Sequence, residues 1–232
     1  MEGNPAQTHD HAHHNGNMNT DCWQSFCDSL LMEDDKAMEG LRASMEERDI
    51  PIIRRETEYF LKWLLASKAP KRILEIGTAA GYSGMYMLRH AQSDATLVTI
   101  EQDARIIPEA RANFSDMSLG SRVSLLEGDA ARVIEDLDEG YDLIFLDSSK
   151  AQYITMLCRL KGLLNEGGIL VSDNILFDGD ILLPRYAVRR RDRTIHKRMR
   201  EYLYAITHDD ELVTDIMPIG DGIAVSTKHE KT

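Results

Sequence analysis

The sequence has few of the features that mark secreted and membrane proteins. Its 232 residues include three cysteines, Cys22, Cys27 and Cys158, too few for a disulfide framework, and the first two lack the second half of a zinc-binding pattern. No apolar run approaches the ~18 residues of a membrane span, and the amino terminus has no apolar signal core. We therefore expect reduced cysteines, no membrane association and a cytoplasmic location.

Both common phosphate-binding patterns are missing from the glycine-rich stretch RILEIGTAAGYSGMYM, residues 72–87. Its glycines stand at 77, 81 and 84, which is not G-x-G-x-x-G, and no GK[ST] is present. An apolar strand pattern ends in a turn with almost no side chains, and helical spacing follows. Free N–H groups at the start of that helix would face the turn, so the stretch predicts a nucleotide-type loop.

Two acids suggest the ligand of this loop. Glu75, just before the turn, would repel a pyrophosphate but suits a cationic amine. Glu101 ends the next apolar strand, 24 residues after Gly77, about where such folds hold ribose hydroxyls. An amine and a ribose without a phosphate indicate S-adenosylmethionine. The alternative is a similar turn in an enzyme that binds another ligand.

Length and composition predict one α/β domain with an appendage, since 43% of the residues are hydrophobic and the chain can bury a large core. Residues 1–20 are polar, lack periodicity and predict a disordered tail, although a His-rich tract can also bind metal. Residues 21–69 predict N-terminal helices, and 70–232 predict the core. The tail histidines are His9, His11, His13 and His14.

The core pattern alternates strands and helices, which predicts a Rossmann-like, mostly parallel seven-stranded sheet with helices on both faces. The predicted strands cover 72–76, 96–101, 122–126, 141–146 and 168–172. The predicted helices lie near 82–91, 104–117, 130–138, 151–164 and 187–207. Two last strands, 211–217 and 223–227, are joined by a tight turn and should form an antiparallel edge.

Acids gather at the carboxyl ends of these strands, where such sheets bind ligands. If strands 141–146 and 168–172 are neighbours, about 4.8 Å apart, then Asp147, Asp173 and Asn174 can converge on one hard cation. Their oxygens suit Mg²⁺, Mn²⁺ or Ca²⁺, and Lys150 beside such an ion would lose its proton readily and act as a base. Alternatively, the three residues cap the following helices and Lys150 is a solvated surface residue.

With these motifs in view, the chain resembles the cation-dependent class I O-methyltransferases, the family of the catechol and caffeoyl-CoA enzymes. The shared segments are ILEIGTAAGYSG, TIEQDARIIPEA, LLEGDA, YDLIFLDSSKAQY, LNEGGILVSDNILFDG and PIGDGIAVS, between about Pro51 and Ser226. It is most similar to the bacterial branch that methylates 5-hydroxyuridine at the tRNA wobble position, through DSSKAQY, DNILFDG, a basic stretch and PIGDG. The resemblance implies a homodimer that acts on the tRNA anticodon region.

The resemblance also implies roles for single residues. Metal ligands would be Asp147, Asp173 and Asn174, with Lys150 and Asp147 as the catalytic pair. The implied cofactor contacts are Glu75, Gly77 and Ser83 for the methionine part, Glu101 for the ribose, Asp129 and Ala130 for the adenine edge, and also Ile53 and Asp147. Two departures affect pocket shape: Ile53 stands where this branch often has methionine, and Ser148-Ser149 replaces two alanines.

Such enzymes need an acceptor with two neighbouring oxygens that chelate the cation, because chelation lowers the pKa of the acceptor hydroxyl. A 5-hydroxyuracil and a catechol both meet this requirement. Methyl transfer is then an in-line displacement for which the protein mainly supplies alignment.

A basic stretch favours the RNA acceptor. Residues 185–200 hold eight Lys/Arg and one Asp, a local charge of +7 in a chain of −12, which leaves −19 elsewhere. Ile195, Met199, Leu203 and Ile206 predict an apolar helix side with the cations outward, which suits a phosphate backbone. The candidate RNA-binding residues are Arg185, Arg189, Arg190, Arg193 and Lys197, and Arg200 is also expected to point outward. Alternatives are a charge counterweight within the chain or at a dimer interface, a catechol-type enzyme, and a non-catalytic cofactor- or RNA-binding protein.

Overall fold

The structure, a computed structural model, describes residues 20–31 and 36–229. The chain divides into two compact units, residues 1–35 and 36–232. In the first unit, the described part is helix α1 (Thr20–Leu30). The predicted His-rich tail lies outside the described residues, apart from Thr20. All three cysteines are free thiols. In the described ranges no helix is both long and apolar enough to cross a membrane.

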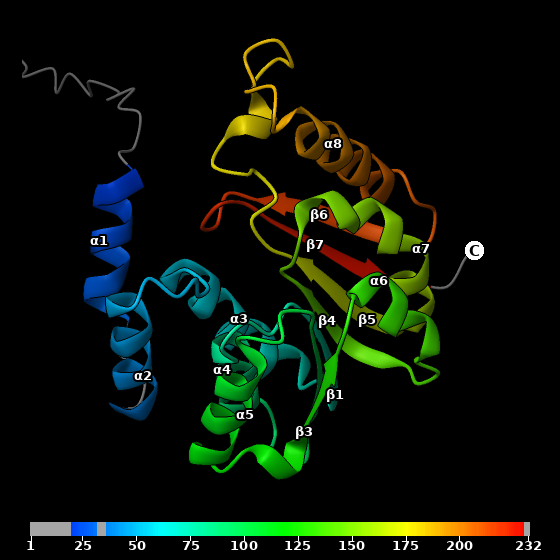
Figure 1. The fold of residues 1–232 in the computed structure, drawn as a ribbon. Helices are drawn as coiled ribbons and strands as arrows, with labels where there is room; N and C mark the ends of the chain where they lie inside the picture. Colours follow the sequence, from blue (N-terminus) through cyan, green and yellow to red (C-terminus); the bar gives the residue numbers. More distant parts are fainter. Residues whose placement is uncertain (1–19, 32–35, 230–232) are drawn as a thin grey trace, which may run out of the picture. The chain divides into compact units, whose positions relative to one another are not determined.

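The second unit is built on a seven-stranded sheet with the order β3-β2-β1-β4-β5-β7-β6 (Figure 1). The first five strands in this order are parallel, and β7 runs antiparallel to both β5 and β6. The predicted mixed sheet is thereby confirmed. The strands are β1 (Arg72–Ile76), β2 (Thr96–Glu101), β3 (Val123–Glu127), β4 (Tyr141–Leu146), β5 (Leu164–Ser172), β6 (Leu212–Met217) and β7 (Ile223–Lys228).

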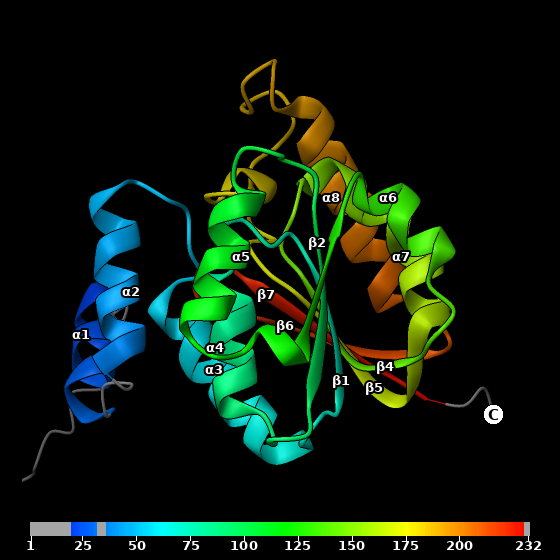
Figure 2. The same cartoon turned by 60° about the horizontal axis from the view of Figure 1, so that its bottom comes forward.

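Helices cover both faces of the sheet (Figure 2). One face packs against α2 (Lys36–Glu47), α3 (Arg55–Lys68), α4 (Tyr82–His90) and α5 (Ile107–Asp116). The other packs against α6 (Ala130–Val133), α7 (Tyr153–Leu163) and α8 (Arg193–Thr207). Strand residues alternate between these two cores: Phe145 belongs to the first, and its neighbours Ile144 and Leu146 to the second. Because both faces are buried, the strands are continuous apolar runs.

Several predicted boundaries shift. The helix predicted at 104–117 begins at Ile107, where a proline follows in the first turn, and Asp103 accepts from the Arg105 N–H in a preceding turn. The last strand before the basic stretch is longer than predicted and begins at Leu164. The segments predicted as helices at 130–138 and 151–164 are each part α-helix and part 3₁₀-helix.

The largest shift concerns the helix predicted at 187–207, which begins only at Arg193. Val188 is buried, and the Arg193 guanidinium donates to the carbonyl oxygens of Val188 and Tyr186 at 3.1 and 3.4 Å. These bonds hold the preceding residues in turns. As a consequence, Arg189 and Arg190 lie before the helix rather than on its outer side.

Candidate active site

A pocket of about 340 Å³ opens at the carboxyl ends of β1, β2 and β4. Of the predicted site residues it collects Ile53, Gly77, Ser83, Glu101, Ala130, Asp147 and Asn174 in its lining. The other lining residues are Pro51, Ile52, Thr78, Ala79, Ala80, Tyr82, Ile100, Gln102, Gly128, Ser148, Ser149 and Gln152. The loop after β1, the ends of β2 and β4 and the segment before α3 therefore meet where the sequence predicted a ligand.

The loop after β1 depends on Gly77. Its φ is +104°, and a Cβ built there would lie 2.1 Å from the Asp147 carbonyl oxygen, so no other residue fits without moving backbone. The Gly77 N–H donates to the Ile100 carbonyl oxygen at 3.0 Å. Gly81 then takes a left-handed conformation, φ +89°, and serves as the N-cap of α4. The turn thus rests directly on the neighbouring strand ends.

Glu75 lies beneath the pocket and is fully buried. Its two carboxylate oxygens accept hydrogen bonds from the hydroxyls of Ser83 and Thr99. Burial raises the pKa of Glu75 to about 7, despite these two hydrogen bonds. Ser83 lines the pocket above the carboxylate, whereas direct contact between Glu75 and a cofactor stays a prediction.

Glu101 fastens the glycine loop to the end of β2. One of its oxygens accepts from the Ala79 N–H at 2.8 Å, and the other accepts from the Gln102 and Asp103 N–H groups, each at 2.8 Å. The carboxylate is half-buried and faces the pocket, so it keeps lone pairs for a ligand hydroxyl.

Asp129 has a structural role that the sequence did not predict. It is the N-cap of α6, and its side chain accepts from the Ala131 N–H at 2.9 Å. Ala130 lines the pocket, whereas Asp129 itself is not among the lining residues. Its predicted contact with an adenine therefore remains a prediction.

The predicted metal ligands and Lys150 come together at the ends of β4 and β5. Lys150 Nζ donates to Asp147 Oδ1 at 2.8 Å, and Asn174 Nδ2 donates to the same oxygen at 3.2 Å. The Asn174 N–H donates to Asp173 Oδ1 at 2.8 Å. Burial, followed by the charge of Asp147, raises the pKa of Asp173 to about 7.

The alternative roles weighed for these residues are not seen. The N-cap positions of the following helical segments are Ser149, Gln152 and Gly179, so none of the three predicted ligands is an N-cap residue of the described helices. The Lys150 side chain is only 14% exposed and is no solvated surface lysine.

These residues fit a hard divalent cation. Two carboxylates and an amide lie beside one ammonium, so negative charge is in excess, and burial followed by repulsion from Asp147 raises the pKa of Asp173. Carboxylate and amide oxygens are what Mg²⁺ and Ca²⁺ prefer, and rotation of the Asn174 amide exchanges its nitrogen for its oxygen. The described residues contain no group of three or more His, Cys, Asp or Glu that could hold a metal ion. The predicted ligand set differs from such a group, because it consists of two aspartates and one asparagine.

Sequence reasoning missed Tyr153, which is fully buried. Its hydroxyl oxygen accepts from Lys150 Nζ at 3.0 Å and lies 2.9 Å from the Leu146 carbonyl oxygen and 3.2 Å from that of Asp173. Tyr153 therefore joins Lys150 to the ends of both β4 and β5. A tyrosine three residues after the lysine, on the same side of a helical turn, was the available signal.

A buried charged cluster behind the pocket was also missed. Arg42 of α2 and Glu58 of α3 form a buried ion pair, and the hydroxyl of Tyr82 donates to Glu58 at 2.6 Å. Arg42 also donates to the carbonyl oxygen of Ile53 at 2.6 Å. Since Tyr82 and Ile53 line the pocket, this cluster connects α2 and α3 to its wall. No local pattern indicates the pair, because 16 residues separate its members.

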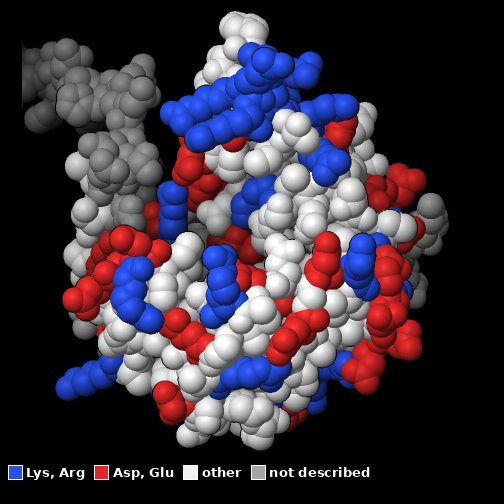
Figure 3. Space-filling view, in the orientation of Figure 1, with Lys and Arg blue, Asp and Glu red and all other residues white. Residues whose placement is uncertain are grey.

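The candidate RNA-binding residues divide into two groups. Arg185, Arg189 and Arg190 are exposed, and their side chains form no hydrogen bond or ion pair with the described residues. Arg193 is half-buried and binds backbone carbonyls, whereas Lys197 lies 3.5 Å from Glu201. Arg200, exposed as expected, donates to a carbonyl oxygen at 3.1 Å. Figure 3 shows cations gathered at the top of the molecule, above α8.

The sheet order and the pocket at the strand ends define a Rossmann-like methyltransferase, as the sequence predicted. The sequence matches the O-methyltransferase family over residues 29–229, and the chain belongs to this family. The predicted enzyme class, an S-adenosylmethionine-dependent O-methyltransferase, is thereby confirmed. The narrower assignment to the tRNA-modifying branch stays a prediction.

Individual relatives agree with this family. The chain is 30% identical over 161 residues to a catechol O-methyltransferase of Mycobacterium tuberculosis, covering 68% of this chain and 73% of the relative. It is 31% identical over 174 residues to a catechol O-methyltransferase of Niastella koreensis, covering 71% and 79%. A solved putative caffeoyl-CoA O-methyltransferase from Staphylococcus aureus is 30% identical, with a TM-score of 0.83 and coverage of 89% and 99%.

Proposed function

We propose that this enzyme methylates the 5-hydroxyl of 5-hydroxyuridine in the anticodon region of tRNA to give 5-methoxyuridine, with a divalent cation, Mg²⁺, as cofactor. The observation that supports an RNA acceptor is the course of the segment between β5 and α8. It begins at Asp173 and Asn174, at the end of β5, and continues into the exposed Arg185, Arg189 and Arg190 before α8 (Figure 1). Cations that lie on the same connection as the reaction site suit the phosphates around a reacting base.

The residues of the pocket would divide the work. Gly77, Ser83 and Glu101 would bind and orient the methyl donor. Asp147, Asp173 and Asn174 would hold the cation, whose positive charge favours the ionised form of an acceptor hydroxyl when it is bound. Lys150, placed by its contacts with Asp147 and Tyr153, would act as the neutral amine and take up the acceptor proton to become an ammonium paired with Asp147.

Alignment is the main contribution of the protein to a methyl transfer. The backbone contact between Gly77 and Asp147 brings the donor loop and the acceptor side of the pocket together. The buried Arg42–Glu58 pair supports the wall formed by Ile53 and Tyr82. A homodimer, which the resemblance implies, and a cytoplasmic location complete the proposal.

A small catechol-like acceptor is the second candidate, and the names of the two catechol O-methyltransferase relatives favour it. Its adjacent hydroxyls would use the same residues as the 5-hydroxyl and 4-carbonyl of 5-hydroxyuracil. It gives no role to the exposed arginines, so the two candidates differ in what those arginines do.

Mass spectrometry of tRNA nucleosides from cells that lack the protein tests the acceptor. We expect 5-hydroxyuridine to accumulate there and to be converted to 5-methoxyuridine by enzyme, methyl donor and Mg²⁺. Unchanged tRNA would refute the RNA acceptor.

Reversal of charge in Arg189→Glu and Arg190→Glu should slow methylation of tRNA but not of free catechol, with the exposed Lys68→Glu as the matched control. Arg193 is left intact because it holds backbone carbonyls.

Removal of the cation tests the cofactor. EDTA should abolish methyl transfer and leave binding of S-adenosylmethionine, measured by calorimetry, largely unchanged. Added Mg²⁺ or Mn²⁺ should restore activity. Full activity after exhaustive chelation would contradict the assigned role of Asp147, Asp173 and Asn174.

A further inference from the structure

A second hollow, which we name the α8 groove, lies between α8 and the segment before it. Its volume is about 560 Å³, within the usual range for ligand sites, and it has no residue in common with the cofactor pocket. One wall is formed by Leu183, Pro184 and Arg185, and the other by His196, Lys197, Arg200, Glu201 and Tyr204 of α8.

Hydrogen bonds from α8 fix the opposite wall of the groove. His196 Nε2 lies 3.0 Å from the Leu183 carbonyl oxygen, and Arg200 Nη1 donates to the Ile181 carbonyl oxygen at 3.1 Å. Both bonds join side chains of the helix to the backbone of the segment. The groove is therefore formed before any ligand arrives, which reduces the entropy lost on binding.

His196 also leaves one polar atom unsatisfied at the groove. The side chain is only 4% exposed, and its Nδ1 has no hydrogen-bond partner among the described residues. Because Nε2 faces a carbonyl oxygen, Nε2 carries the proton and Nδ1 is left as an acceptor in the neutral ring. Buried polar atoms without a partner are uncommon in proteins, so this ring nitrogen marks His196 as an unusual residue in the wall of the groove.

The charges of the groove select an anion. Arg185, Lys197 and Arg200 supply three positive charges against the single carboxylate of Glu201. Glu201 lies 3.5 Å from Lys197 in an exposed pair, which is weak in water. The groove therefore keeps a net positive charge, and a phosphate group suits it.

Aromatic and apolar surface at the same place suits a nucleobase. Tyr204 is 65% exposed, and its ring stacks on that of His208 with centroids 3.9 Å apart and an angle of 17°. Leu183, across the groove, is 41% exposed. Cations combined with exposed aromatic rings are the usual platform for unpaired bases.

We propose that the α8 groove binds one unpaired nucleotide of the RNA acceptor, apart from the nucleotide that is methylated. The base would lie against Tyr204 and Leu183, and its phosphate between Arg185, Lys197 and Arg200. The proposal rests on the RNA substrate proposed above and adds a separate anchoring site. A free mononucleotide has the same chemistry, and the experiment separates the two.

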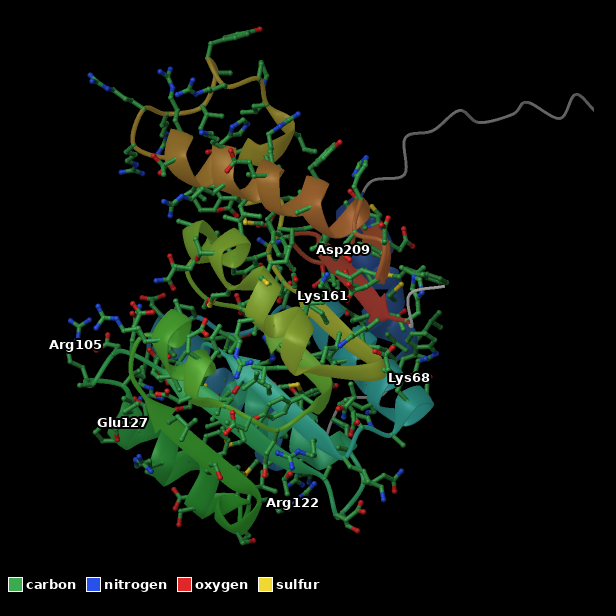
Figure 4. The ribbon with its side chains drawn as sticks, turned by 90° about the vertical axis from the view of Figure 1, so that its right-hand side faces the viewer. Lys68, Arg105, Arg122, Glu127, Lys161 and Asp209 are labelled. Carbon is green, nitrogen blue, oxygen red and sulfur yellow. The ribbon has the colours of Figure 1, made fainter. Side chains whose placement is uncertain are left out.

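Fluorescence anisotropy with a labelled anticodon stem-loop RNA tests the groove. Tyr204→Ala should weaken RNA binding by about tenfold, the typical loss when one stacking base contact is removed, and Tyr204→Phe should bind within about twofold of the unchanged protein. Arg185→Gln should lower the slope of log affinity against log salt by about one unit. Lys68→Gln is its control, because Figure 4 places Lys68 far from the segment before α8.

Controls separate this proposal from a loss of folding and from the proposed function. The groove variants should keep the melting temperature and the methylation rate of free catechol. If the unchanged protein methylates tRNA and Tyr204→Ala binds RNA equally well, the groove is not a nucleotide site although the RNA acceptor stands. If the unchanged protein binds no RNA, both proposals fail. A mononucleotide that binds the unchanged protein but not Tyr204→Ala, and that does not displace tRNA, would show a mononucleotide site and overturn the RNA anchor.

Discussion

Two buried charged clusters of this enzyme differ in how well they are satisfied. In the Arg42 cluster, a guanidinium meets the Glu58 carboxylate, and Arg42 also bonds to Glu46, the Tyr82 hydroxyl and a carbonyl oxygen. The other oxygen of Glu58 lies 3.2 Å from Arg55. In the Asp147 cluster, Lys150 bonds to the Asp147 carboxylate alone, while the buried Asp173 carboxylate is held by the Asn174 N–H and lies close enough to Asp147 for the two charges to repel. The first is balanced within the chain, whereas the second has an excess of negative charge.

The difference indicates which cluster maintains the fold and which one binds. A balanced buried pair needs no ligand, so its loss is expected to affect stability. An unbalanced buried cluster is retained at a cost in stability, which is typical of functional sites. Four predictions test this contrast.

The largest effect should come from Asp173→Asn. Removing one of two carboxylates that hold the cation should lower kcat by about 10³-fold. At pH values above 7, the same change should leave the melting temperature of the metal-free protein unchanged or increase it. The reason is that the pKa of Asp173 is raised to about 7, so its ionisation in the folded protein is unfavourable. Steady-state kinetics and thermal melts measure both. Loss of stability together with activity would break the contrast.

Arg42→Met should show the opposite result. Glu58 would remain buried without its main partner, so unfolding in urea should show a loss of about 3 kcal/mol. The double variant Arg42→Met with Glu58→Leu removes both charges and should recover most of this loss. If the double variant loses as much unfolding free energy as the two single variants together, Arg42 and Glu58 do not stabilise each other and the contrast fails.

The affinity for S-adenosylmethionine should rise about fivefold to tenfold between pH 6 and pH 7.5. The pKa of Glu75 rises from 4.5 to about 7, so the folded protein binds a proton there that the unfolded chain has lost, and stability falls as pH rises from about 4.5 to 7. A cationic ligand favours the ionised form, and S-adenosylmethionine should therefore bind more tightly at pH 7.5 than at pH 6. Calorimetry measures this, and Glu75→Gln should abolish both trends.

The smallest effect should come from a pair near the surface. Lys161 of α7 lies 2.9 Å from Asp209 Oδ2, and the two side chains point toward each other in Figure 4. Both are about one fifth exposed, so Lys161→Met should cost under about 1 kcal/mol in urea unfolding and leave kcat unchanged. If Lys161→Met lowered the free energy of unfolding as much as Arg42→Met does, burial could not explain the difference between the two ion pairs.

The sequence was sufficient for whatever depends on local pattern. Continuous apolar runs located β1, β2 and β4 to the residue, and the acids after them predicted where the pocket lies. The sequence was not sufficient where distant side chains decide. The start of α8 depends on Arg193 binding carbonyls, and the Arg42–Glu58 pair joins two helices whose separate patterns show no sign of it.

The missing side chain at Gly77 has a consequence for how this enzyme can change. Main chain touches main chain there, so the spacing between the donor loop and the strand end that carries Asp147 is set by the width of two peptide backbones. Rotamer changes elsewhere cannot alter that spacing. A variant with a different acceptor preference therefore has to change other parts of the pocket wall, while this spacing stays as it is.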